Sequence, residues 1–133
     1  MVLRNLGKIM EEPLDRRTQD RIMIPGSEIY YKPKRTFGFL YKYHGPQKLI
    51  DISKSGAGFI ASLPISRIPD LDVKVKVPGE DIIKLKGTVV WKSGVMEPGR
   101  IRMGMQFFPF GKSRIYNSPI SLAKLSLLDH KFH

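Results

Sequence analysis

Residues 73–77 read Val-Lys-Val-Lys-Val and run directly into Pro78-Gly79. Strict alternation of apolar and charged residues is typical of a β-strand that has one face in the core and one face in water. The Pro-Gly pair favours a turn, because proline presets φ and glycine tolerates a positive φ. The segment therefore predicts a strand that ends in a tight turn, with Lys74 and Lys76 on its solvated face.

Similar short runs and turns occupy most of the chain on both sides of this segment. The other strand-like runs are Ile29–Lys32, Phe37–Tyr43, Lys48–Ile52, Gly58–Ser62, Ile82–Trp91 and Ile101–Phe108. The other turn signals are Gly45-Pro46, Ser55-Gly56, Pro69-Asp70 and Pro98-Gly99. This close spacing indicates an all-β fold of antiparallel hairpins, closed into a sandwich or a small barrel. There is no βαβ alternation, which argues against a dinucleotide-binding sheet.

The two ends of the chain differ from this pattern. Residues 1–15 have weak periodicity and contain Pro13, so we expect an N-terminal arm. Near the other end, Ser118-Pro119 predicts a helix start, with serine as the N-cap and proline in the first turn. We therefore expect a folded domain over residues 16–128 that ends in a helix packed on the barrel, followed by a tail over residues 129–133.

Composition narrows the class of protein. The chain has 133 residues, of which 41% are hydrophobic and 26% are charged, as in one folded domain. No run approaches the roughly 18 apolar residues of a membrane span, and polar residues interrupt the first ten, so we expect a cytoplasmic protein without membrane insertion. With no cysteine and only three histidines, structural zinc and other resident metal cofactors are not expected.

The charge balance points to an anionic partner. The formal net charge is +11, spread evenly over both halves of the chain, and this suits phosphates, nucleic acid or an acidic surface. Catalysis is not expected, because no nucleophile has an evident oriented base and His44 lies beside a predicted turn, where an exposed side chain is the simpler interpretation. Trp91, in a strand-like run, is expected in the core rather than as a base-stacking surface.

Two short segments are candidates for binding. Residues 15–21 read Asp-Arg-Arg-Thr-Gln-Asp-Arg, which places three arginines within six positions. Arginine can grip phosphate or the O6/N7 edge of guanine with two parallel hydrogen bonds and can stack on a base, so the cluster suits a purine nucleotide. Taken alone, the cluster is weak evidence, because basic clusters are usually ordinary solvated surface.

Residues 51–58, Asp-Ile-Ser-Lys-Ser-Gly-Ala-Gly, are the second segment. As a hairpin turn, Asp51 and Ser53 would bond the backbone and Gly56 would supply a positive φ. As a binding segment, the carboxylate would accept hydrogen bonds from guanine N1 and N2, and serine and backbone N–H groups would reach phosphate. The residues leave both interpretations open.

Taken together in this order, Arg17-x-x-x-Arg21 and Asp51-x-Ser53-x-x-Gly56 resemble the two-part signature of PilZ domains. In that family Arg17 and Arg21 would clamp phosphate and guanine edges from an arm that wraps over the ligand. Asp51 would pair with the guanine Watson-Crick edge or orient an arginine. Ser53 would hydrogen-bond the ligand, and Gly56 would let the backbone come close.

Later residues extend the resemblance from Arg16 to Leu128. Residues 87–91, Gly-Thr-Val-Val-Trp, are similar to the family's penultimate strand, and residues 103–107, Met-Gly-Met-Gln-Phe, to its Gly-x-x-Phe ending. The resemblance implies a six-stranded antiparallel β-barrel with a C-terminal α-helix. It also implies a bacterial receptor for the second messenger cyclic di-GMP rather than an enzyme. Such a receptor acts on an unidentified partner protein, with outputs of the motility, biofilm or exopolysaccharide type.

Some details stay open at this point. Arg16 is similar to the extra basic residue of family members that bind a stacked ligand pair, or it faces solvent or pairs with Asp15 or Glu12. Asp20 lies inside the arginine motif and can compete for its arginines. The alternative functions are a basic β-barrel that binds single-stranded nucleic acid, which the sequence favours less, and an adaptor that has lost nucleotide binding. Neither monomer nor homodimer is excluded.

Overall fold

The computed structural model describes residues 21–34, 42–62 and 70–132, except for the side chains of residues 94–97. The expected N-terminal arm, Arg16, Arg17 and Asp20 lie outside these ranges, and so does most of the strand expected over residues 37–43. The described end of that run, Lys42 and Tyr43, comes just before a strand instead of forming one.

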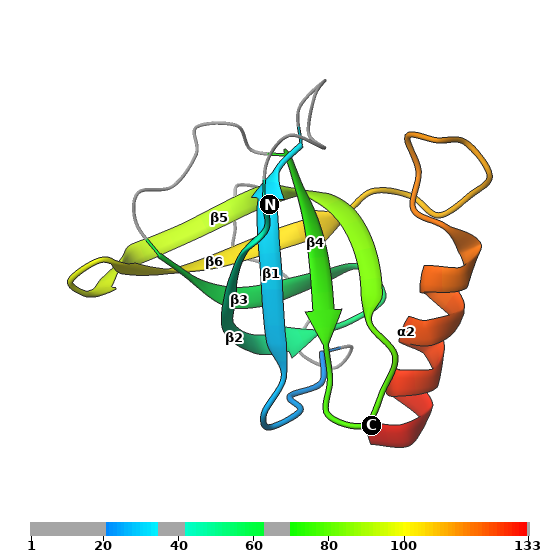
Figure 1. The fold of residues 1–133 in the computed structure, drawn as a ribbon, viewed down its shortest axis with the longest axis horizontal. Helices are drawn as coiled ribbons and strands as arrows, with labels where there is room; N and C mark the ends of the chain where they lie inside the picture. The colour runs from blue at the N-terminus through cyan, green and yellow to red at the C-terminus, as the bar shows by residue number, and fades with distance from the viewer. Residues whose placement is uncertain (1–20, 35–41, 63–69, 133) are drawn as a thin grey trace, which may run out of the picture.

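Six antiparallel strands form a closed barrel, and one helix lies beside it (Figure 1). The elements are β1 (Glu28–Pro33), β2 (His44–Ile52), β3 (Gly56–Ser62), β4 (Asp70–Lys76), β5 (Ile83–Glu97), β6 (Arg100–Phe107) and α2 (Pro119–Phe132). Around the barrel the neighbours are β1-β2-β3-β6-β5-β4. The predicted all-β class, a six-stranded antiparallel barrel with a C-terminal helix, is confirmed.

Strand β4 shows how the alternation of the sequence builds the barrel wall. Leu71, Val73 and Val75 are buried, while Lys74 and Lys76 face outward. Because side chains on a strand alternate between two faces, one apolar residue in two is enough to line a closed interior. The turn predicted at Pro78-Gly79 follows this strand, with Gly79 at a φ of 80°.

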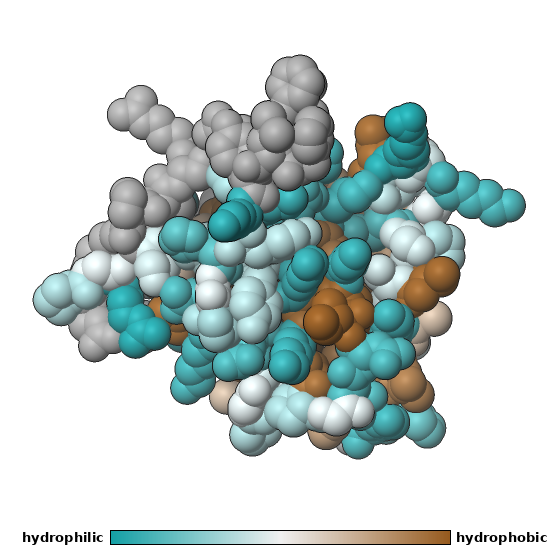
Figure 2. Space-filling model, viewed as in Figure 1, coloured by the Kyte–Doolittle hydropathy of each residue, from teal (hydrophilic) through white to brown (hydrophobic). Residues whose placement is uncertain are grey.

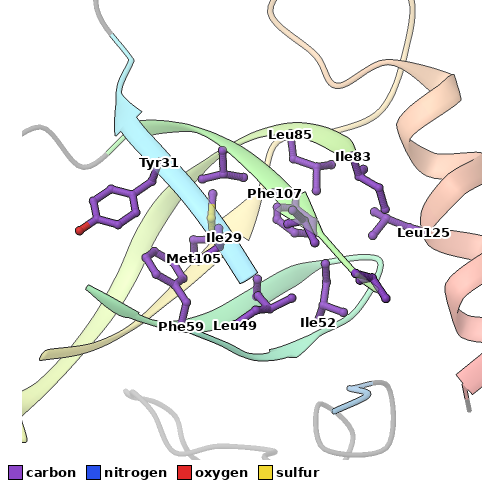
Figure 3. Close-up of a cluster of buried hydrophobic side chains, with 14 of the residues drawn as sticks. Ile29, Tyr31, Leu49, Ile52, Phe59, Ile83, Leu85, Met105, Phe107 and Leu125 are labelled. Atoms are coloured by element: carbon purple, nitrogen blue, oxygen red, sulfur yellow. The ribbon is translucent and has the colours of Figure 1, made fainter. Parts of the chain in front are cut away.

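The barrel interior is a continuous apolar core (Figure 3). Its fully buried side chains include Ile29, Ile52, Phe59, Met103 and Met105. Burial of one such side chain contributes about 1.5–3 kcal/mol, so closure of the barrel is the main source of stability.

Helix α2 begins where Ser118-Pro119 predicts it. The Ser118 hydroxyl accepts a hydrogen bond from the amide of Ile120 at 3.1 Å, which satisfies one of the unpaired N–H groups of the first turn. The helix runs along the side of the barrel, next to the connection between β4 and β5 (Figure 1). Leu125 and Leu128 join the core, and Figure 3 shows Leu125 beside Ile83 of β5.

Two expected boundaries are wrong. Gly45-Pro46 lies within β2 instead of forming a turn, because these two residues oppose Tyr30 alone at an irregularity in the β1–β2 pairing, where proline needs no ladder hydrogen bond. Residues 129–132, expected as a tail, belong to α2. The Lys131 ammonium, 3.0 Å from a Glu80 carboxylate oxygen, ties the last helical turn to the β4–β5 connection.

Candidate functional site

A short antiparallel bridge brings the second arginine of the signature to the end of β2. The amide of Ile22 donates to the carbonyl of Ile52 at 2.9 Å, and the amide of Ile52 donates to the carbonyl of Ile22 at 3.0 Å. Both isoleucine side chains point into the core. Because strand side chains alternate, the neighbouring Arg21 and Asp51 face the outside of the barrel.

Arg21 and Asp51 form an ion pair at this corner. Nη1 of Arg21 lies 2.5 Å from Oδ1 of Asp51, with 21% and 15% of the two side chains exposed. The same carboxylate oxygen accepts the amide of Gly58 on β3 at 3.1 Å. Asp51 therefore fixes the guanidinium against two strands. A guanidinium carries five N–H donors, and this contact occupies one of them.

Ser53 organises the turn between β2 and β3. Its hydroxyl accepts hydrogen bonds from the amides of Ser55 at 3.1 Å and Gly56 at 3.2 Å, and its own amide donates to the carbonyl of Gly56 at 2.8 Å. The residue is buried, at 7% exposure. The expected hairpin turn, with Asp51 and Ser53 bonded to the backbone, is confirmed.

Gly56 is required for a reason other than the one expected. It is not among the glycines with a positive φ, so that part of the sequence interpretation is wrong. A Cβ atom on Gly56 would lie 2.2 Å from the carbonyl oxygen of Met105 on β6. The absence of a side chain therefore lets β3 and β6 approach at the start of their pairing.

Two more glycines lie under other side chains on the outer side of the barrel, and both are buried. Gly58 of β3 and Gly104 of β6 are register partners. A Cβ on Gly58 would lie 2.9 Å from Oδ1 of Asp51, and one on Gly104 would lie 2.1 Å from Nε1 of Trp91. The Asp51 carboxylate therefore packs over Gly58 and the Trp91 indole packs over Gly104, and the missing Cβ atoms let both groups lie close to the strands.

Trp91 is outside the barrel, so the expectation that it belongs to the core is wrong. Leu85, Gly87 and Val89 follow the inward alternation of β5, which would place Trp91 inward as well. The pairing with β6 shifts between Val89 and Trp91, and this bulge turns the indole to the outer face above Gly104. There the Trp91 ring is half-buried, with the guanidinium carbon of Arg102 5.8 Å from its centroid.

The described residues place part of the predicted site. Arg21, Asp51, Ser53 and Gly56 gather at the end of β2 and the start of β3, whereas Arg16 and Arg17 lie outside the described ranges. Sequence reasoning missed the Gly58–Gly104 pair, for which the only signal is a glycine on each of the two strands.

The described part of the chain offers no cluster of three or more histidine or carboxylate side chains that could bind a metal ion. Within the same residues, no helix combines the length and hydrophobicity needed to cross a membrane.

Comparison with known proteins agrees with this arrangement. A sequence profile of the PilZ domain matches residues 15–114. The chain therefore belongs to the PilZ domain family. No curated protein sequence gives a significant match.

Two solved structures share the fold. One is the PilZ domain of Escherichia coli YcgR with c-di-GMP, which is 13% identical, with a TM-score of 0.56 over 84% of this chain and 87% of that one. The other is the Bacillus subtilis inhibitor of motility MotI/DgrA, at 12% identity and a TM-score of 0.54. The match covers 79% of this chain but only 46% of MotI/DgrA.

Proposed function

We propose that this protein is a receptor for cyclic di-GMP that binds the nucleotide on the outer face of β2, β3 and β6. The observation that carries the proposal is the Arg21–Asp51 pair, held at the signature turn by the amide of Gly58. Membership of the PilZ domain family supports it. The structure of the YcgR PilZ domain with c-di-GMP, which has the same fold, supports the choice of ligand.

The chemistry of the corner suits a guanine dinucleotide. Arg21 has N–H donors beyond the one paired with Asp51, and a planar fork of this kind binds a phosphate or the O6/N7 edge of guanine. In this proposal Asp51 orients Arg21, the second of the two roles that the family resemblance left open. Gly58 and Gly104 let the Asp51 carboxylate and the Trp91 indole lie close to the strands, and the half-buried indole offers a face for stacking.

The remaining signature arginines complete the proposal. Arg16 and Arg17 precede Arg21 by a few residues of the same segment, which is near enough in the sequence for them to contact a ligand bound at Arg21. We infer that this segment closes over the bound nucleotide, because the ligand's phosphates neutralise cations that otherwise repel one another. The closed arm and ligand would then form a surface that a partner protein binds. In this proposal the chain acts as an effector rather than an enzyme.

Calorimetric titration with cyclic di-GMP, beside GTP and a short oligonucleotide, tests the function. We expect a dissociation constant of about micromolar or lower for cyclic di-GMP, since each charge-assisted hydrogen bond contributes roughly 1.5–3 kcal/mol. GTP and the oligonucleotide should bind much more weakly. Absence of cyclic di-GMP binding, or preference for the oligonucleotide, would contradict the proposal and favour the nucleic-acid alternative.

A further inference from the structure

A second cationic site lies on another face of the barrel. A cleft of about 620 Å³ separates the outer side of β4 and β5 from the loop that joins β6 to α2. In the barrel order β4 is three strands away from β3, so the cleft and the signature corner face different sides. A ligand in the cleft would leave the proposed nucleotide face free.

Asn117 holds the loop rigidly against β5. Its side-chain oxygen accepts the amide of Lys86 at 2.6 Å, and its side-chain nitrogen donates to the carbonyls of Lys86 and Phe108, both at 2.9 Å. Its backbone pairs with Pro109 and Gly111. Asn117 is 1% exposed, so these bonds form in a dry environment and the loop is preorganised.

This fixed loop places cations on both sides of the cleft. Lys84 and Lys86 line it from β5, and Lys112 and Arg114 line it from the loop. Asp72 is the only carboxylate among the described lining residues. No ion pair joins a carboxylate to Lys84, Lys112 or Arg114 in the part of the chain that the structure describes. With four cations against one carboxylate in its lining, the cleft carries a net positive charge that suits an anionic partner.

Of the two aromatic rings at the cleft, that of Tyr43 is not an open platform for nucleotide bases. The ammonium groups of Lys32 and Lys74 lie 4.7 and 4.3 Å from the centroid of the Tyr43 ring. The Tyr116 ring packs on Gly111, where a Cβ atom would lie 2.8 Å from Cδ2 of the ring, and the residue stays 39% exposed. Single-stranded nucleic acid stacks successive bases on several exposed rings, and the described lining of the cleft offers Tyr116 alone, which disfavours it.

Exposed hydrophobic side chains that adjoin the lining residues in the sequence favour a protein segment instead. Ile115, on the loop, and Ile120, in the first turn of α2, are 64% and 67% exposed. On the face shown in Figure 2, hydrophilic side chains dominate and hydrophobic ones form small separate areas. Carboxylates would pair with the cations, and apolar side chains of the same segment would cover the isoleucines.

We propose that the cleft between β4–β5 and the loop preceding α2 is a docking site for an acidic, amphipathic segment of a partner protein. This surface is separate from the proposed nucleotide site and can be occupied together with it. A protein with both sites would sense a nucleotide on one face and hold its partner on another.

The test uses a fluorescein-labelled peptide of repeated Glu-Glu-Leu triplets, followed by anisotropy at low ionic strength. Reversing two loop charges, Lys112→Glu with Arg114→Glu, should weaken binding by about tenfold or more. The matched control, Lys48→Glu with Lys92→Glu, changes the net charge equally at exposed positions outside the cleft and should weaken binding about twofold or less. A length-matched Gln-Gln-Leu peptide should not bind measurably.

Three results would overturn the proposal. They are an equal loss in both double variants, unchanged binding in the cleft variant, and tighter binding of an oligothymidylate than of the acidic peptide. Cyclic di-GMP titration of the cleft variant separates this inference from the proposed function, because the nucleotide affinity should stay at the wild-type value while peptide binding is lost.

Discussion

Nη1 of Arg21 lies 2.5 Å from Oδ1 of Asp51, although 30 positions separate the two residues in the chain. The bridge between Ile22 and Ile52 holds the two backbones together, so the pair does not depend on a ligand for its position. Part of the proposed binding surface is therefore formed before any nucleotide arrives, and this lowers the ordering cost of binding.

Replacing Arg21 with alanine should weaken cyclic di-GMP binding by about tenfold or more, because charge-assisted hydrogen bonds to the ligand are lost. The free energy of unfolding should fall by less than about 1 kcal/mol, since the ion pair is partly exposed to solvent. Calorimetry and thermal denaturation measure the two effects. The matched control is Lys131→Ala, which breaks the ion pair between the last turn of α2 and Glu80. This variant should leave nucleotide affinity unchanged. Wild-type affinity in Arg21→Ala would refute the site.

Ser53→Ala should cost about 1–2 kcal/mol in the free energy of unfolding, because the amides of Ser55 and Gly56 lose their acceptor in a turn that is partly buried. Denaturant titration checks the value. Ser113→Ala removes a hydroxyl that accepts one amide in an exposed loop, so it should change stability by less than about 0.5 kcal/mol. Equal effects in the two variants would show that Ser53 does not organise the turn.

Gly56→Ala should destabilise the fold by more than about 2 kcal/mol, since the new Cβ would meet the Met105 carbonyl at 2.2 Å and force β3 away from β6. Gly79→Ala is the comparison, because nothing lies within 4 Å of its Cβ and only its φ of +80° is unfavourable. That variant should cost about 1 kcal/mol. If the two variants lose the same stability, the close strand approach is not what Gly56 provides.

The barrel could be predicted from the sequence because its signals are local. Alternation such as that of residues 73–77 depends only on which side chains can face an apolar interior, and turns such as Pro78-Gly79 depend on the backbone preferences of two residues. The start of α2 at Ser118-Pro119 is local in the same way. The expected turn at Gly45-Pro46 failed because the pairing irregularity opposite Tyr30 is a property of two strands together.

The candidate site also depends on contacts between segments that lie far apart in the sequence. The signature residues Arg21, Asp51 and Ser53 could be selected from their spacing, but the ion pair that joins two of them depends on the Ile22–Ile52 bridge. Trp91 could not be placed, because strict alternation sends it inward and only the bulge after Val89 sends it outward. A bulge can shift the register without requiring a particular residue type, so the sequence of β5 does not predict it.

Trp91 is the single tryptophan of the chain, which makes it a built-in probe of the proposed site. Its intrinsic fluorescence should change on addition of cyclic di-GMP, because a guanine stacked on the indole alters the environment of the ring. Titrating the nucleotide into wild-type protein and into Arg21→Ala measures this, and the variant should need about tenfold more ligand for the same change. Trp91→Leu should weaken binding in calorimetry. Saturable binding with no change in emission would place the nucleotide away from Trp91.

Arg16→Ala tests how many nucleotides one chain holds. If Arg16 bridges a stacked pair, a second ligand brings phosphates that Arg17 and Arg21 alone cannot neutralise. The ligand-to-protein ratio should then fall from about two in the wild-type chain towards one in Arg16→Ala, with the first molecule still tightly bound. Arg17→Ala should instead weaken binding of every molecule. Calorimetry at protein concentrations well above the dissociation constant measures the ratio. A wild-type ratio of one would rule out the stacked pair and leave Arg16 as a surface charge.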